Sequence, residues 1–280
     1  MNQEKFQTVD KCAGKNVLAS ALSHSMYCDA PCLPFGDELK TSSQELVEYL
    51  LNEEDDLVPV KSDENVKIAG KMGIQKLISL FENAMDLLQL NSFPSTETIE
   101  ANLLQYLTDL DWVCNIVPKL GLMEEFILRW GEISEKILLI IGDNSFISVF
   151  WSLKLKLIVI VGKILDAVGY GTVILPPEYR MNLLKIWLPF IRKMKPFLDA
   201  KGYPYSMDEE LCENIEGAIV SLLLALPSND QADILAEWMN SDQIGTFPDL
   251  RNAFEIWCYR TKSAKRRLLD YKETRSDPSN

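Results

Sequence analysis

The sequence is poor in the side chain that enzymes use most often for proton transfer. Among 280 residues there is one histidine, His24, and its surroundings lack strong hydrophobic periodicity. General bases and proton shuttles are most often histidines held in a rigid cleft. We therefore expect His24 to be an exposed or half-packed side chain. Because no nucleophile–base motif accompanies it, we expect no catalytic residues, no cofactor-binding residues and no enzymatic activity.

Cysteine is also sparse, and its distribution argues against a disulfide framework. The six cysteines are Cys12, Cys28, Cys32, Cys114, Cys212 and Cys258. They are thinly spread, and neither a secretory leader nor an Arg-rich transit peptide is visible before them. We expect reduced thiols and a location in the cytoplasm, the nucleus or both.

One group of residues has the composition of a zinc site, namely Cys12, His24, Cys28 and Cys32. The last three would share one face of a helix at spacings of four residues. Structural zinc sites, however, usually pair ligands two to four residues apart at tight turns, and Pro31 would interrupt such a helix. The spacing therefore predicts no metal ligands, and metal binding by these four residues is left for measurement.

Long uninterrupted apolar runs are missing, although the stretch "ISVFWSLKLKLIVIV" at 147–161 comes nearest. A membrane helix needs about 20 predominantly apolar residues, whereas Lys154 and Lys156 interrupt this stretch and Lys163 follows it. On a helix, Lys154 and Lys156 would point to nearly opposite sides, so no orientation in lipid suits both. We expect no membrane association.

The same stretch alternates like a strand, which is the main rival interpretation. Both flanks nevertheless show helical spacing, and no second strand of similar quality lies within hairpin reach. We predict a buried helix from Ser145 to Val168. The stems of its lysines should lie along apolar surface while their ammonium groups reach water.

The charge balance is acidic. The 28 basic and 41 acidic residues leave a net charge of −13, which repels nucleic acid and anionic lipid over most of the surface. We expect no nucleic-acid partner. The exception is a basic tail, "RTKSAKRR" at 260–267. It fits a nuclear import signal, a contact for an acidic partner, or compensation of a helix dipole near a C-terminus, and the sequence does not choose among these.

Hydrophobic periodicity predicts an all-α protein, an irregular multi-helix bundle of about nine or ten helices. Apolar residues recur at steps of three and four in the ranges 66–90, 97–117, 183–198, 211–226, 230–239 and 250–257. Pro189 and Pro196 within the third range predict a kink or two shorter helices. A short turn at Pro227 predicts that the helices on either side pack as a hairpin. Such hairpins could stack as in a solenoid, although no fixed repeat length is visible.

Local signals suggest where several helices begin and end. Three serines have Glu or Gln three residues later, the spacing of a capping box: Ser42 with Glu45, Ser206 with Glu209, and Ser228 with Gln231. Pro248 suits the first turn of the last helix. The "GYGT" sequence at 169–172 lacks the spacing of a phosphate loop and predicts a helix C-cap followed by a turn. The six tryptophans lie on helix-patterned stretches, which predicts that most are in the core.

The pattern divides the chain into three parts. Residues 1–64 form an acidic, loosely ordered lead-in with short helices, 65–270 form a helical domain, and 271–280 form a disordered tail. The lead-in has weak periodicity and contains most of the excess acidic charge.

Several long segments, in the same order, resemble the C-terminal helical region of a plant family of BTB/POZ-domain proteins. They include "PFGDELKTSSQELVEYLL", "LDAVGYGTVILPPEYRMNLLKIWLPFIRKMKPFLD" and "NIEGAIVSLLLALPSNDQADILAEWM". The resemblance implies a BACK-like helical region in a substrate adaptor of a cullin-RING ubiquitin ligase, acting in protein ubiquitination. In such adaptors the BTB domain holds the cullin, and the helical region supports it and presents targets. The family offers no catalytic residues to carry over.

The resemblance does not extend to the BTB domain itself. That domain mixes strands and helices over about 100 residues, whereas the first sixty residues here are acidic and poor in strand signals. We therefore expect no BTB domain in this chain, a ubiquitination substrate as its partner, and a cullin partner only if a BTB domain is supplied. The rival interpretation is a stand-alone helical scaffold with no ubiquitin role, acting in the nucleus. The oligomeric state stays open.

Overall fold

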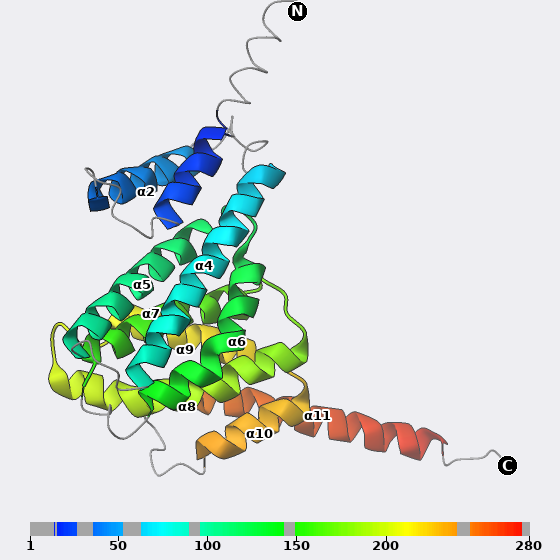
Figure 1. Cartoon of the computed structure of the whole chain (residues 1–280). Helices are drawn as coiled ribbons and strands as arrows, with labels where there is room; N and C mark the ends of the chain where they lie inside the picture. Colours follow the sequence, from blue (N-terminus) through cyan, green and yellow to red (C-terminus); the bar gives the residue numbers. More distant parts are fainter. Residues whose placement is uncertain are drawn as a thin grey trace, which may run out of the picture. The chain divides into compact units, whose positions relative to one another are not determined.

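The computed structural model describes residue 14 and residues 16–26, 36–52, 63–89, 96–142, 149–239 and 247–275. Residues 16–26 are helical, and within the described ranges there is no strand. The remaining helices are α2 (Gly36–Asn52), α4 (Glu64–Gln89), α5 (Thr96–Ile116), α6 (Met123–Ile141), α7 (Trp151–Gly169), α8 (Pro177–Lys201), α9 (Glu209–Leu224), α10 (Ser228–Met239) and α11 (Arg251–Arg275) (Figure 1). The prediction of an all-α protein with about nine or ten helices is confirmed for the described part of the chain.

The chain forms two compact units, Met1–Ile160 and Val161–Asn280. The division falls inside α7, so the first unit contains the first half of that helix and the second unit contains the rest. The boundaries expected near residues 64 and 270 stay a prediction, because they concern a different division of the chain.

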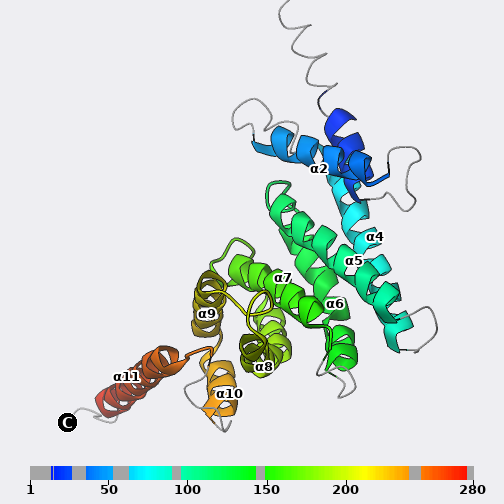
Figure 2. The same ribbon diagram turned by 90° about the vertical axis from the view of Figure 1, so that its left-hand side faces the viewer.

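The first unit is built around α4, which packs against α5 and α6. Both ribbon views show these three helices side by side (Figures 1 and 2). The buried stripe of α4 includes Ile74, Leu77 and Phe81, spaced so that they share one helix face. Phe81 stacks on Trp130 of α6 with ring centroids 6.2 Å apart. An aromatic core therefore joins two long helices.

An ion-pair bridge supports the same contact between α4 and α6. Lys136 Nζ lies 2.9 Å from Glu82 Oε1 and 2.7 Å from Asp86 Oδ1. Hydrogen bonds to Asp86 and then to Glu82 raise the pKa of Lys136 above its usual value. The side chains are about one-third exposed or more, so each pair contributes at most about 1 kcal/mol to stability.

Helix α7 begins at Trp151, later than the predicted Ser145; residues 145–148 lie outside the described ranges. Lys154 is fully buried, with 0% of its surface exposed. Its Nζ donates to the Val149 carbonyl at 2.9 Å and lies 4.7 Å from the ring centroid of Trp151. The expectation that this ammonium reaches water is therefore wrong, because acceptors beside the first turn of the helix hold it inside the protein.

The second lysine of this stretch behaves differently. Lys156 is half-buried, and its Nζ forms an ion pair with Asp111 Oδ2 of α5 at 2.7 Å. None of the described helices combines the length and the apolarity that crossing a bilayer requires. Lys154 therefore binds a backbone carbonyl, whereas Lys156, two positions later, binds a carboxylate.

The turn after α7 confirms the predicted helix C-cap. The Tyr170 amide donates to the Asp166 carbonyl at 3.0 Å, and the Val173 amide donates to the Ala167 carbonyl at 2.9 Å. Gly171 has a φ of 80°, a left-handed conformation that favours glycine. Gly169 allows a close approach within the second unit, because a Cβ there would collide with the Ala218 carbonyl of α9.

Helix α8 is one continuous helix that contains both Pro189 and Pro196, so the alternative of two shorter helices is wrong. Both prolines lie at exposed positions, whereas Trp187, Phe190 and Ile191 are buried. The buried face spans the sites of both prolines, and its packing holds the helix together where backbone hydrogen bonds are lost.

The three predicted capping boxes are all wrong. Ser42 lies inside α2. The N-cap of α9 is Asp208 rather than Ser206, and its Oδ1 accepts from the Leu211 amide at 2.8 Å. Helix α10 already includes Ser228, and Gln231 Nε2 donates to the Leu226 carbonyl at 2.6 Å. Several polar residues near a helix end can each accept these amides, so spacing alone did not identify the cap.

In the second unit the closely packed helix pairs are α8 with α9, α9 with α11, and α10 with α11. The hairpin of α9 with α10, predicted from the short turn, is not among them. Helix α11 begins at Arg251, so Pro248 precedes it and the prediction that placed Pro248 in its first turn is wrong. Asp249 Oδ1 instead accepts from the Arg251 amide at 3.0 Å.

The tryptophans divide into buried and partly exposed residues. Trp130, Trp187 and Trp238 are buried. Trp112 and Trp257 are half-buried, and their indole nitrogens donate to Glu48 Oε1 at 2.7 Å and to the Ser228 carbonyl at 3.1 Å. Their amphipathic rings thus lie at the edge of the core.

Candidate functional site

Of the four residues with the composition of a zinc site, the structure describes one. His24 is exposed on the helix at 16–26, and Cys12, Cys28 and Cys32 lie outside the described residues. Within the described ranges no three His, Cys, Asp or Glu side chains come together as metal ligands. Among the described thiols, burial raises the pKa of Cys212, which disfavours a reactive thiolate.

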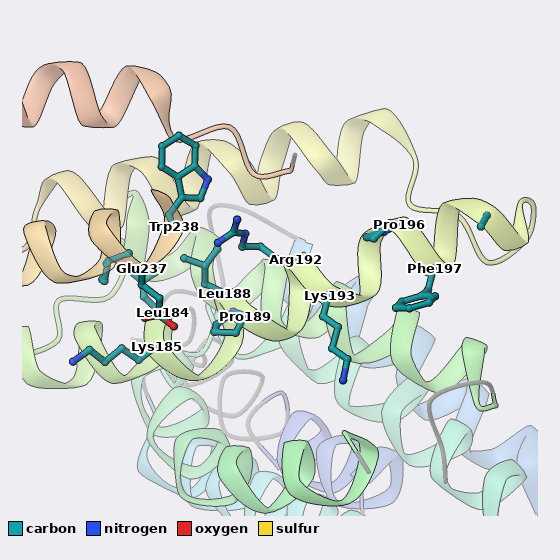
Figure 3. Close-up of a pocket in the computed structure, with 12 residues that line it drawn as sticks. Leu184, Lys185, Leu188, Pro189, Arg192, Lys193, Pro196, Phe197, Glu237 and Trp238 are labelled. Carbon is teal, nitrogen blue, oxygen red and sulfur yellow. The ribbon is translucent and has the colours of Figure 1, made fainter. Parts of the chain in front are cut away.

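A groove in the second unit is a better candidate. It lies between α8 and α10 and has a volume of about 650 Å³ (Figure 3), within the range of about 300–1,000 Å³ that is typical of ligand sites. Its lining residues are Leu184, Lys185, Leu188, Pro189, Arg192, Lys193, Pro196, Phe197, Ala200, Ile234, Glu237 and Trp238.

The groove has an apolar lining that both helices provide. Leu184 and Leu188 of α8 and Ile234 and Trp238 of α10 are buried members of this lining. Figure 3 shows Arg192 extending from α8 toward Trp238, while Lys193 and Phe197 leave α8 in a different direction. The groove therefore combines an apolar lining with charged side chains.

One side of the groove is an exposed row on α8, which we call the α8 stripe: Lys185, Pro189, Lys193, Pro196, Phe197 and Ala200. These residues follow one another mainly at helical spacings of three and four, so they share one face. Phe197 is 44% exposed, whereas Phe190, which also follows a proline, is 7% exposed and packs edge-on against Trp187. The fold therefore buries the ring of Phe190 and leaves the ring of Phe197 at the surface.

The groove is cationic at its margin. Its charged lining residues are three cations, Lys185, Arg192 and Lys193, and one carboxylate, that of Glu237. Burial lowers the pKa of Arg192 because it disfavours the charged guanidinium, and Glu237 offsets part of this effect. Within the described part of the chain, neither Lys185 nor Lys193 takes part in an ion pair. A site in an acidic protein thus carries a local excess of positive charge.

The prolines add backbone acceptors. Proline has no N–H, so the carbonyl four residues earlier in a helix loses its usual donor. For Pro189 this carbonyl belongs to Lys185, which also lines the groove. The α8 stripe can therefore offer apolar surface, ammonium groups and a main-chain acceptor within a short length of helix.

A second hollow, between α2 and α5 of the first unit, has a different character. Its volume is about 410 Å³, and its lining is polar, including Gln44, Gln105 and Asn115. Lys40 and Asp109 form an ion pair across it, and Asp109 is 5% exposed. The charges in this hollow are already matched by the fold, so it is the weaker candidate for a binding site.

The sequence contained one signal of the groove that periodicity did not reveal. The Pro-Phe dipeptide occurs twice in "WLPFIRKMKPF", at Pro189 and Pro196, seven residues apart. Two turns of helix place both prolines on one face. Which face lies outward depends on the packing of α8 against its neighbours, and that was not readable from the dipeptides.

Comparisons with known proteins agree on one family. A family model described as BTB/POZ Ankyrin-like repeat matches residues 40–264, a range that includes the whole groove. A BTB/POZ domain-containing protein of Arabidopsis thaliana is 36% identical over 275 residues, covering 94% of this chain and 61% of the relative. A second BTB/POZ domain-containing protein of the same plant is 23% identical over 199 residues, covering 67% of this chain and 33% of that protein.

The chain spans less than two thirds of the length of both of these curated relatives. No solved structure matches the chain.

Proposed function

The chain belongs to the BTB/POZ ankyrin-like repeat family, and from this membership we propose that it is a non-enzymatic protein-interaction module. Its specific role is the substrate-recognition and support region of a BTB-type adaptor for a cullin-RING ubiquitin ligase. In this role the chain holds a target protein, and a BTB domain, where one is joined to it, holds the cullin.

The groove between α8 and α10 is the single observation that carries the proposal. It is large enough for side chains of a partner, it is lined by apolar residues from two helices, and it carries positive charge at its margin. Apolar anchors surrounded by polar groups are the usual composition of a protein-binding surface. The groove lies inside the range that the family model matches.

A non-enzymatic role agrees with the chemistry around the groove. The ionisable groups that line it are Lys185, Arg192, Lys193 and Glu237. Three of these four groups are cations, a composition that suits binding of anionic groups on a ligand. We propose recognition rather than bond cleavage as the activity of this surface.

The test of the adaptor role supplies the domain on which cullin binding depends. The BTB domain of the 36% identical relative is joined upstream of the full chain, and the fusion is purified from plant cells and probed for a cullin. The expected result is that the fusion recovers a cullin and the chain by itself does not. Failure of the fusion to recover any component of the ubiquitin pathway contradicts the adaptor role.

Helix α11 favours a second function, that of a nuclear scaffold with no ubiquitin role. Its basic residues Arg260, Lys262, Lys265 and Arg266 are all exposed. The helix continues to Arg275, so the cluster lies more than one turn before the end, where the dipole has little effect. Compensation of the dipole therefore does not explain the cluster. Nuclear accumulation of a reporter fused to residues 251–275 supports this function, and exclusion from the nucleus counts against it.

A further inference from the structure

The prolines of α8 are the feature that the fold explains least. A proline inside a helix costs about 3 kcal/mol relative to alanine, because it removes a hydrogen bond and crowds the preceding turn. Pro189 and Pro196 both lie at exposed positions of the α8 stripe. Neither residue therefore recovers that cost by filling the core. The position of this destabilising pair of prolines on the surface of a groove indicates that they contact another molecule.

The charge of the same surface points to the chemistry of that use. The chain as a whole carries a net charge of −13, whereas the groove margin carries three cations against the single carboxylate of Glu237. Burial already lowers the pKa of Arg192, so a carboxylate from a ligand would stabilise its charged form. Charge complementarity therefore favours an anionic occupant.

The length of the groove fits an extended segment of a partner. From Leu184 to Ala200 the α8 axis rises by about 24 Å, at about 1.5 Å for each residue. An extended peptide of about seven residues covers that length at about 3.3 Å for each residue. An extended backbone also exposes N–H groups that could donate to the Lys185 carbonyl, which a helical ligand, whose amides are internally bonded, would do less readily.

We propose that the groove between α8 and α10 binds an extended segment of a partner protein, about seven residues long, in which apolar side chains are flanked by carboxylates. Phe197, Pro189 and Pro196, which are exposed apolar residues of the lining, contact the apolar side chains. Lys185, Lys193 and Arg192 bind the carboxylates, and the Lys185 carbonyl accepts from the peptide backbone. This inference rests on the proposed function, because it names the class of target segment that the recognition region takes.

The experiment selects ligands without assuming a partner. A phage-displayed library of random nonapeptides is panned against the purified full chain, and the most enriched peptide is labelled with fluorescein for anisotropy titrations. The expected result is enrichment of peptides that combine Asp or Glu with Leu, Ile, Phe or Trp. Enrichment of basic or uncharged peptides, or no enrichment at all, overturns the proposal.

Charge-reversal variants locate the binding site. Lys185→Glu combined with Lys193→Glu should weaken binding at least about tenfold, the equivalent of roughly 1.4 kcal/mol. The matched control is Lys71→Glu combined with Lys119→Glu, which changes the net charge equally at exposed positions of the first unit. The control should change binding less than about twofold, because it alters the net charge without altering any residue that lines the groove. Equal weakening by both double variants overturns the local recognition.

The apolar part of the proposal is tested separately. Phe197→Ala should also weaken binding about tenfold or more, within the range of interface aromatic residues, while leaving the circular dichroism spectrum and melting temperature unchanged because the ring is exposed. Unchanged peptide affinity in this variant overturns the assigned anchor. An unlabelled single-stranded DNA oligonucleotide is the competitor. Displacement of the labelled peptide by this DNA at equal concentration would show generic anion binding and overturn peptide recognition.

The library experiment and the cullin experiment fail independently. Peptide binding needs neither a BTB domain nor a ubiquitin component. Selected acidic peptides without cullin recovery would retain the groove as a peptide site and remove the ubiquitin role. Cullin recovery without peptide enrichment would retain the adaptor role and remove this groove as the recognition surface.

Discussion

Helices α7 and α8 follow each other in the chain and differ in where their unusual residues lie. Helix α7 places lysines in an apolar stretch, and the fold accommodates them internally: Lys154 binds the Val149 carbonyl and Lys156 pairs with Asp111. Helix α8 places prolines and Phe197 on an exposed stripe, and within the described residues its Lys185 and Lys193 form no ion pair.

The comparison separates residues whose interactions lie within the fold from residues for which we propose an external partner. A buried charge must find a partner inside the protein, because leaving it unpaired costs several kcal/mol. An exposed apolar residue beside a cation without an ion pair has no such requirement and is available for an external contact. The lysines of α7 therefore have partners within the fold, whereas the α8 stripe is the surface for which we propose an external partner.

The largest expected effect compares the two Pro-Phe pairs. Phe190→Ala should lower the free energy of unfolding by about 3–5 kcal/mol, because it empties a buried site against Trp187. Phe197→Ala should change it by no more than about 0.5 kcal/mol, as is usual at exposed positions. Urea denaturation measures both. Similar losses in the two variants would break the distinction between the buried face and the α8 stripe.

The next effect concerns the lysines of α7. Lys154→Ala should cost about 2–4 kcal/mol of stability, because it removes a buried stem and leaves the Val149 carbonyl without this donor. Lys154→Met keeps the stem and should recover part of that loss. Lys156→Ala, at a half-buried ion pair, should cost about 1 kcal/mol or less. Thermal unfolding of the three variants distinguishes them, and equal values for Lys154→Ala and Lys156→Ala would contradict the account.

The prolines of α8 should show a gain rather than a loss. Pro189→Ala should raise the free energy of unfolding by about 1–2 kcal/mol, less than the full cost of proline because alanine also loosens the unfolded chain. Peptide binding should weaken in the same variant, because the Lys185 carbonyl regains a helical donor. Greater stability with unchanged peptide affinity would contradict the proposed role of Pro189 in peptide binding.

A smaller effect outside both helices serves as a reference. The side-chain and backbone hydrogen bonds of Arg251 hold the pKa of Asp249 below its usual value. A lowered pKa in the folded state means that this contribution is present above the ordinary pKa of about 3.9 and is lost as the pH falls below it.

Asp249→Ala should therefore cost about 0.5–1 kcal/mol at neutral pH, in the lower part of the range for helix caps. The difference in urea midpoint between wild type and Asp249→Ala should shrink as the pH is lowered from 5 toward 3. A difference that does not depend on pH would contradict the role of the carboxylate.

Helical periodicity predicted the long helices well, because a helix that buries one face has apolar residues at steps of three and four. The stripe predicted for 66–90 appears as α4, and the stripe for 97–117 appears as α5. Helix ends were less predictable, since Asp208 and Ser206 are both good acceptors and only the backbone path selects Asp208.

Tertiary packing decided the features that the sequence did not predict. The burial of Lys154 depends on the Val149 carbonyl and the Trp151 ring lying beside it. The groove depends on α10 placing Ile234 and Trp238 next to α8. Both arise from contacts between elements that periodicity treats separately, so neither could be read from one stretch of sequence.

The most direct measurement joins the groove to ubiquitin transfer. The peptide enriched by library selection is attached to an inert fluorescent reporter, and reporter ubiquitination is followed in a reconstituted reaction with the chain joined to a BTB domain. The account predicts ubiquitinated reporter with the unaltered groove and little or none with Lys185→Glu and Lys193→Glu, while Lys71→Glu and Lys119→Glu leave the reaction unchanged. Equal ubiquitination in all three, or none in any, would contradict the claim that α8 and α10 present targets.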